Sequence, residues 1–262
     1  MGVTGFVRGR KSLPFLDTER RDVWWASPLA TFAVLASFIV YATWAAFQGD
    51  HYTYGPYLSP FYSPEIFGSS SHAWFGPKPS WWPAFLPFSP AILILWAPAG
   101  FRTTCYYYRG AYYKAFWADP PACAVGEPRK SYWGEASLPL ILQNIHRYFL
   151  YLAVVFIGVL AWDVVKATRF EDGFGVGVGT LVLLTNVVLL SSYTFGCHSM
   201  RHLIGGGRDR LPKGVHGDCY RCVSGLNKRH QLFAWFSLFG VALSDVYVRL
   251  CSMGILNDLR IF

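Results

Sequence analysis

The residues with the clearest metal-binding chemistry follow directly after a long apolar run. Residues 174–195 carry no charge, and the segment that comes next reads Cys197-His-Ser-Met-Arg-His202. His198 and His202 are spaced i and i+4, so both imidazoles leave the same face of a helix. Thiolates and imidazoles are the side chains that bind transition metals and iron–sulfur clusters. The pattern therefore indicates redox metal chemistry where an apolar span ends.

Two more cysteines complete a possible ligand set. A Rieske-type [2Fe–2S] cluster has two Cys on one iron and two His on the other. The sequence offers this set as Cys105, Cys123, His198 and His202, with Cys197 as an alternative thiol. All five fall on the same predicted side of a membrane, as argued below. The usual spacing of soluble Rieske domains is absent, so the prediction of a membrane-embedded Rieske-type cluster rests on the ligand inventory.

Two other interpretations stay open. A single b haem could use His146 with His198 or His202 as axial ligands, which would leave the cysteines unexplained. A pair of haems would need histidines in the outer half of the apolar spans, and the sequence places none there. A non-redox membrane scaffold or transporter could carry the same thiols and cations without binding a metal.

Hydrogen-bond donors that could hold a quinone lie near the same boundary. They are Tyr106, Trp117, His146 and Arg201. The fixed positive charge of Arg201 would stabilise a reduced quinone anion, and a histidine can deliver a proton near neutral pH. The competing role for Arg201 is to bind lipid phosphate or a partner subunit.

The composition places these residues in an integral membrane protein. Hydrophobic residues make up 53% of the 262-residue chain and charged residues 15%, whereas soluble domains carry about 25% charged residues. Spans long enough to cross a hydrocarbon core of about 30 Å are found five times, at about 24–47, 83–101, 138–165, 174–195 and 232–255. We predict an all-α integral membrane fold, with five transmembrane helices in a bundle.

The positive charges predict the orientation of this bundle. Of the 23 Lys and Arg residues, 17 fall in residues 1–23, 101–137 and 196–229, and the side richer in Lys and Arg is cytoplasmic. The N-terminus is then cytoplasmic and the C-terminus outside, and the net charge of +8 needs no nucleic-acid partner.

The same reading divides the chain into a cytoplasmic arm, residues 1–23, and a membrane domain, residues 24–262. The aromatic loop 48–82 is expected to fold as a cap on the outer side. Loops 101–137 and 196–229 are expected to carry the ligands on the cytoplasmic side. We therefore expect a multi-pass protein of a bacterial plasma membrane, in contact with membrane lipid.

Four segments of the sequence resemble a known family. They read Arg102-Thr-Thr-Cys105-Tyr-Tyr-Tyr-Arg, Pro120-Pro-Ala-Cys123-Ala-Val, Leu140-Ile-Leu-Gln-Asn-Ile-His146-Arg-Tyr and Cys197-His-Ser-Met-Arg-His202. Together they resemble the membrane anchor of actinobacterial succinate dehydrogenase. The segments Gly225-Leu-Asn-Lys-Arg-His230 and Leu243-Ser-Asp-Val-Tyr-Val-Arg249 fit the same group, whereas the pair Cys219 and Cys222 lies outside the motif.

The resemblance implies a membrane anchor subunit of a succinate:menaquinone oxidoreductase. A flavoprotein with FAD and an iron–sulfur subunit with further clusters would dock on the cytoplasmic face. Succinate would be oxidised on the partner, and the electrons would pass to menaquinone. The chain lacks the outer histidines of the better-known five-helix anchors that bind two b haems, which favours the cluster over haem.

Overall fold

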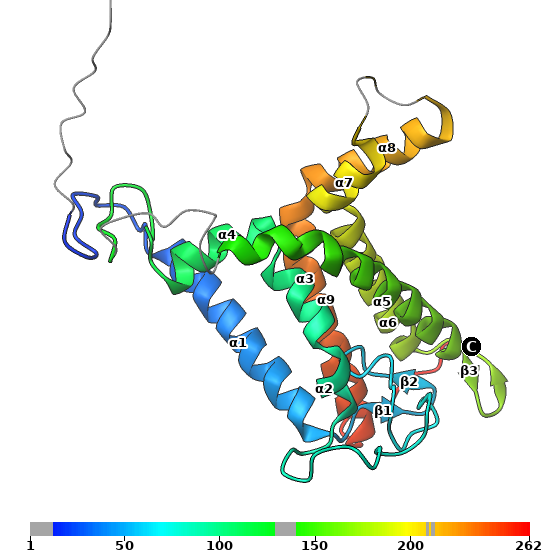
Figure 1. Ribbon diagram of the computed structural model, residues 1–262. Coiled ribbons are helices and arrows are strands. Elements are labelled where there is room, and N and C mark those ends of the chain that lie inside the picture. The colour runs from blue at the N-terminus through cyan, green and yellow to red at the C-terminus, as the bar shows by residue number, and fades with distance from the viewer. Residues whose placement is uncertain (1–12, 129–139, 208–209, 211–212) are drawn as a thin grey trace, which may run out of the picture. The chain divides into compact units, whose positions relative to one another are not determined.

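The structure, a computed structural model, describes residues 13–128, 140–207, 210 and 213–262 (Figure 1). The chain divides into two compact units. Unit one comprises residues 1–37 and 104–143, and unit two comprises residues 38–103 and 144–262. The boundary at residues 37 and 38 falls inside the first helix, α1 (Ala26–Gln48).

Within the described residues, four helices are long and apolar enough to cross a membrane. They are α1, α5 (His146–Lys166) with the preceding 3-10 turn η2 (Leu140–Ile145), α6 (Val178–Phe195) and α9 (His230–Ser252). The 18 residues of α6 extend about 27 Å at about 1.5 Å each, close to the thickness of a hydrocarbon core. The predicted helical membrane class is confirmed.

The fifth predicted span, residues 83–101, is not one long helix. The structure has α2 (Pro90–Ile94) and α3 (Trp96–Thr103) there, two short helices in sequence. Pro90 stands in the first turn of α2 and Pro98 in the first turn of α3. Proline lacks the backbone N–H that a helix interior needs, but it is tolerated in a first turn. The count of five spans therefore stays a prediction, as does the cytoplasmic N-terminus.

Unit two is built around α6, which packs against α9 and α5, while α3 packs against α5 (Figure 1). The helix α6 begins at Val178 rather than at residue 174. The residues before it form an antiparallel hairpin of β3 (Arg169–Phe170) and β4 (Gly173–Phe174). Gly173 has φ +126°, which a residue with a side chain rarely adopts. A glycine at this position therefore allows the tight turn between β3 and β4.

The aromatic loop, residues 48–82, packs on the helices of unit two. It contains the hairpin of β1 (Thr53–Tyr54) and β2 (Tyr57–Leu58). Phe61 and Tyr62 are buried in one cluster with Ala45 of α1 and Ala91 of α2. A Cβ on Gly179 of α6 would lie 2.5 Å from the Tyr57 ring. The glycine therefore lets the Tyr57 ring approach α6 closely.

Buried carboxylates join this loop to the helices. Asp245 of α9 accepts hydrogen bonds from Ser59 and from Tyr41, the latter at 2.5 Å. Asp163 of α5 accepts one from Ser63. A carboxylate at membrane depth is expensive unless it is paired. These two acids therefore stabilise the fold of unit two by holding the loop.

Unit one holds α4 (Tyr106–Ala111) and the π-helical turn η1 (Tyr112–Phe116). Residues 14–20 pair with residues 123–126 through the bonds Leu16 N–H to Gly126 O and Gly126 N–H to Asp17 O, both 2.9 Å. The loop that contains Cys123 is thus held by the N-terminal segment. Two stretches of these predicted segments lie outside the described residues. They are residues 1–12 of the predicted arm 1–23 and residues 129–137 of the predicted loop 101–137.

Candidate metal and quinone site

A cluster of aromatic rings and histidines, buried except for the half-buried His230, lies in unit two where several helices begin or end. His146 is the first residue of α5, His230 is the first of α9, and Cys197 directly precedes α7 (His198–Gly205). Phe101 comes from α3 and Tyr193 from α6. We call these five residues the histidine–aromatic cluster.

Direct contacts run through the whole cluster. His146 Nε2 lies 3.0 Å from Cys197 Sγ. The Phe101 ring stacks on the His146 imidazole with centroids 4.7 Å apart, and the Tyr193 ring stacks on the His230 imidazole at 4.9 Å. Phe101 and Tyr193 meet edge to face at 5.5 Å. The two histidines are therefore held on either side of one aromatic pair.

A fixed positive charge lies beside the cluster. Arg102 of α3 donates to Ser237 Oγ at 3.0 Å and to Ala234 O at 3.3 Å on α9. Its guanidinium carbon is 4.8 Å from the centroid of the Tyr193 ring. The charge-assisted bonds hold the guanidinium in place, so it is part of the electrostatic environment of the cluster.

The predicted histidine ligands are exposed, whereas Cys197 is buried. Both His198 and His202 are exposed on α7, and His202 Nδ1 lies 2.9 Å from Arg147 Nη2. Cys197 is 2% exposed, and its thiol accepts a hydrogen bond from Ser199 N–H at 3.3 Å as the N-cap of α7. The structure therefore brings the alternative thiol to His146. In the described part of the chain, no group of three or more His, Cys, Asp or Glu side chains converges as a metal site.

The other two predicted thiols belong to unit one. Cys105 is 2% exposed and precedes α4, whereas Cys123 is exposed and its carbonyl accepts from Arg20 at 2.9 Å. The pair Cys219 and Cys222 is exposed on α8 (Gly214–Lys228). Burial distinguishes Cys105 from the exposed thiols.

The predicted quinone residues are spread over both units. In unit one, Tyr106 is 65% exposed beside Arg109, and Trp117 packs on Tyr112. In unit two, Arg201 donates to the Tyr220 hydroxyl at 3.2 Å and so joins α7 to α8, while His146 belongs to the histidine–aromatic cluster.

Sequence reasoning missed four residues of this site: Phe101, Arg102, Tyr193 and His230. A signal for His230 was present, because His146 and His230 each stand at the start of a long apolar helix on the same predicted side. Two helices that begin with histidine at the same membrane depth can bring their imidazoles together. The roles of Arg102 and Tyr193 depend on tertiary contacts and have no comparable signal in the sequence.

Comparison with known proteins identifies relatives. A family model described as actinobacterial succinate dehydrogenase subunit SdhC matches residues 26–254. No curated protein matches the sequence. Among solved structures, a chain of the Mycobacterium smegmatis Sdh1 complex in the apo form is 43% identical. The alignment covers 98% of both chains, with a TM-score of 0.87.

Proposed function

Because the chain belongs to the family of actinobacterial succinate dehydrogenase subunit SdhC, we propose that it passes electrons from succinate to menaquinone. As a multi-pass subunit of the plasma membrane it anchors the complex, an oxidoreductase. Succinate is oxidised at FAD on a partner flavoprotein, and an iron–sulfur subunit carries the electrons to the membrane. The similarity to a chain of the Mycobacterium smegmatis Sdh1 complex over almost its whole length supports these partners.

The histidine–aromatic cluster carries the proposal for the redox centre. The residues of unit two that would hold a Rieske-type [2Fe–2S] cluster are His146, His230 and Cys197. Cys105, which belongs to unit one, stays a candidate for the second thiol on its residue type alone. This set takes up Cys197, the alternative thiol, because it is buried. It replaces Cys123, His198 and His202, which are exposed.

The donor chemistry fits, since a Rieske centre takes two imidazole nitrogens and two thiolates. One observation limits the fit: His146 Nε2 and Cys197 Sγ contact each other directly at 3.0 Å. These two side chains would have to separate to take up a cluster. When bound, such a cluster transfers one electron at a time at a raised potential.

The residues around the cluster would position and tune it. Phe101 and Tyr193 stack on the imidazoles and exclude water. The Arg102 guanidinium, held against Tyr193, would stabilise the added negative charge of a reduced centre, because a fixed cation acts strongly where water is excluded. These contacts support electron transfer at this end of the bundle.

For the bundle and the quinone we retain the sequence-based proposals. The helices α2 and α3 would together make the fifth crossing, with the N-terminus cytoplasmic, since the Lys and Arg residues are concentrated in three of the connecting segments. Tyr106, Trp117 and Arg201 remain our candidates for the donors at the place of quinone reduction. His146 moves from that group to the metal ligands.

The proposed function is tested by two activities of the same membranes. Cells that lack the chain should lose succinate–menaquinone turnover, and the flavoprotein should move to the soluble fraction. Succinate oxidation with an artificial acceptor at the flavin should persist there. Quinone turnover that survives without the chain would refute the proposal. A visible spectrum of the purified complex with sharp b-haem bands would assign the redox centre to haem instead.

A further inference from the structure

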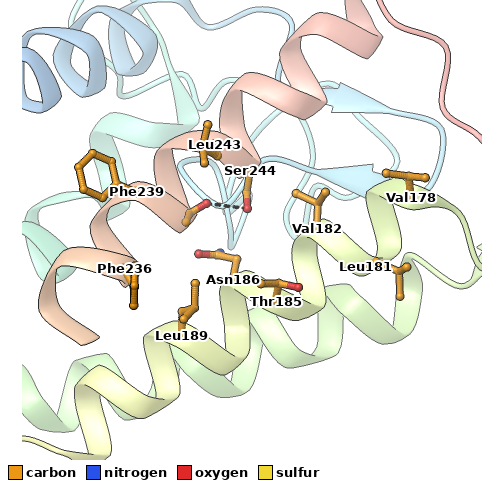
Figure 2. A pocket seen from close by; sticks show the side chains of 11 residues that line it. Val178, Leu181, Val182, Thr185, Asn186, Leu189, Phe236, Phe239, Leu243 and Ser244 are labelled. Carbon is orange, nitrogen blue, oxygen red and sulfur yellow. Dashed lines mark hydrogen bonds between the residues drawn. The ribbon is translucent and has the colours of Figure 1, made fainter. Parts of the chain in front are cut away.

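A groove of about 400 Å³ lies between α6 and α9 in unit two. Figure 2 shows its lining side chains, which are contributed by the two helices alone. Along its length it is mostly apolar, with Leu181 and Leu189 on α6 and Phe236, Phe239 and Leu243 on α9. The side chains of Leu181, Phe239 and Leu243 are 43%, 46% and 64% exposed. The groove therefore opens on a surface that faces lipid.

One polar side chain is buried in the middle of this groove. Asn186 is 1% exposed, and neither its amide nitrogen nor its amide oxygen has a hydrogen-bond partner among the residues that the structure describes. It points into the space between the helices (Figure 2). A buried amide without a partner destabilises a protein by about 1–3 kcal/mol, and within a bilayer there is no water to satisfy it.

Gly240 provides the room around this amide. A Cβ on Gly240 would lie 2.9 Å from Leu189 Cδ1 and 3.8 Å from Asn186 Oδ1. The nearby hydroxyl of Ser244 is already engaged, because it donates to Gly240 O at 2.8 Å. The groove thus has a buried carboxamide whose N–H groups and oxygen are both without a partner, and the exposed hydroxyl of Thr185 also lines it.

We propose that this groove binds an isoprenoid quinone, with the headgroup on Asn186 and the tail along the apolar walls. The site is additional to the boundary residues retained above, and the inference rests on the proposed function, since a quinone is the electron acceptor. The amide N–H donates to a quinone carbonyl, and the amide oxygen accepts from a quinol hydroxyl. The same side chain therefore fits both the oxidised and the reduced form of the quinone.

Other occupants fit the groove less well. An acyl chain of a lipid has no group that could pair with the amide. A transmembrane helix is about 10 Å wide, too wide to enter a groove of about 400 Å³. Only one of its polar side chains could reach into the groove. The aromatic walls of Phe236 and Phe239, by contrast, suit a flat ring.

The position is also consistent with electron transfer. Asn186 precedes Tyr193 by seven residues on α6, which is about 10 Å along a helix. A quinone in the groove would then lie within one or two layers of side chains of the histidine–aromatic cluster.

The test uses the purified complex with a photoreactive naphthoquinone that carries a short prenyl tail. We expect the label on peptides of α6 and α9, and we expect a menaquinone analogue to displace it. Asn186→Leu should raise the apparent KM for the quinone about threefold to tenfold, the value of one lost hydrogen bond. Gly240→Val should block the labelling.

Two controls make the result specific. Gly158→Val on α5, where nothing lies within 4 Å of a Cβ, should leave labelling and KM unchanged. Asn186→Leu should keep or raise the melting temperature, because it removes an unpaired buried amide. A lowered melting temperature with normal labelling would mean that Asn186 is a packing residue and would overturn the inference.

Three further outcomes separate the hypotheses. Label found only at Tyr106, Trp117 or Arg201, with normal quinone turnover, would overturn the groove and leave the proposed function intact. A change in oligomeric state in Asn186→Leu without a change in quinone KM would assign the groove to a second copy of the chain. A wild-type complex that neither labels nor reduces quinone would refute the proposed function itself.

Discussion

The buried ion pair of α9 should be the strongest single link between the aromatic loop 48–82 and the helices of unit two. Asp245 is 0% exposed and Arg249 is 4% exposed, with Arg249 Nε 3.3 Å from Asp245 Oδ2. Asp245 also accepts from Tyr41 and Ser59, whereas Arg249 donates to Gln48 Oε1 at 3.0 Å. The substitution Asp245→Ala would leave a buried guanidinium without its counter-charge and two hydroxyls without an acceptor.

The expected loss is about 3–5 kcal/mol, the range for breaking a buried pair by removing one partner. For a chain of this size 1 kcal/mol corresponds to about 2–4 °C, so the melting temperature should fall by roughly 6–20 °C. The assay heats the purified complex in detergent and follows the temperature at which this chain leaves the soluble fraction.

A matched control carries the same change of charge at the surface. Asp218 pairs with Arg221 on α8, and both side chains are more than two-thirds exposed. Exposed pairs contribute about 0–1 kcal/mol, so Asp218→Ala should be nearly neutral. The double variant Asp245→Leu/Arg249→Leu should recover much of the loss, because no unpaired charge remains. If Asp245→Ala melts like Asp218→Ala, the reasoning about the loop is wrong.

Three further predictions follow from other parts of unit two. Gly179→Ala should destabilise the complex by about 1–3 kcal/mol, since the new Cβ would meet the buried Tyr57 ring at 2.5 Å. Gly158→Ala is the neutral control in the same thermal assay. Equal melting temperatures of the two variants would contradict the predicted clash with Tyr57. Burial, together with the charge of Lys166, lowers the pKa of His72, so the protonated imidazole is less stable in the folded state than in the unfolded state. The stability of the fold should therefore decrease as the pH drops below about 6.5. His72→Phe should reduce that loss of stability between pH 7.5 and 5.5. Arg201→Ala should lower succinate–quinone turnover and spare the artificial acceptor, whereas parallel loss of both activities would assign Arg201, with its partner Tyr220, to holding the complex together.

Local sequence patterns predicted the membrane helices well. The stretches that became α1, α5, α6 and α9 are apolar enough that the burial of backbone polar groups in lipid leaves the helix as the stable form. The residues 83–101 are equally apolar, but Pro90 is the first residue of α2 and Pro98 lies in the first turn of α3, so the run divides into two helices. Hydropathy alone does not show where this run divides into two short helices, and the fifth span stays a prediction.

The candidate site was harder to predict, because its members come from five segments of the chain. Cys197 was recognised by its residue type, but its neighbour His198 points to a different side of α7. Adjacent residues at the start of a helix point in different directions, so the thiol of Cys197 is buried while the imidazole of His198 is exposed. The sequence assigned His146 to the quinone donors, whereas the structure shows its imidazole in contact with Cys197. Its contact with Cys197 depends on how α5 meets the end of α6, which no local pattern specifies.

The central claim is that His146 and His230, rather than His198 and His202, hold a redox cluster. The most direct measurement is the iron and acid-labile sulfide content and the electron-spin resonance spectrum of the reduced complex. His146→Ala should abolish the Rieske-type signal and lower the iron content by two atoms, while the chain still inserts and the partners still dock. His198→Ala/His202→Ala should leave the signal unchanged. Loss of the signal in the second variant alone, or an unchanged signal in the first, would contradict the account.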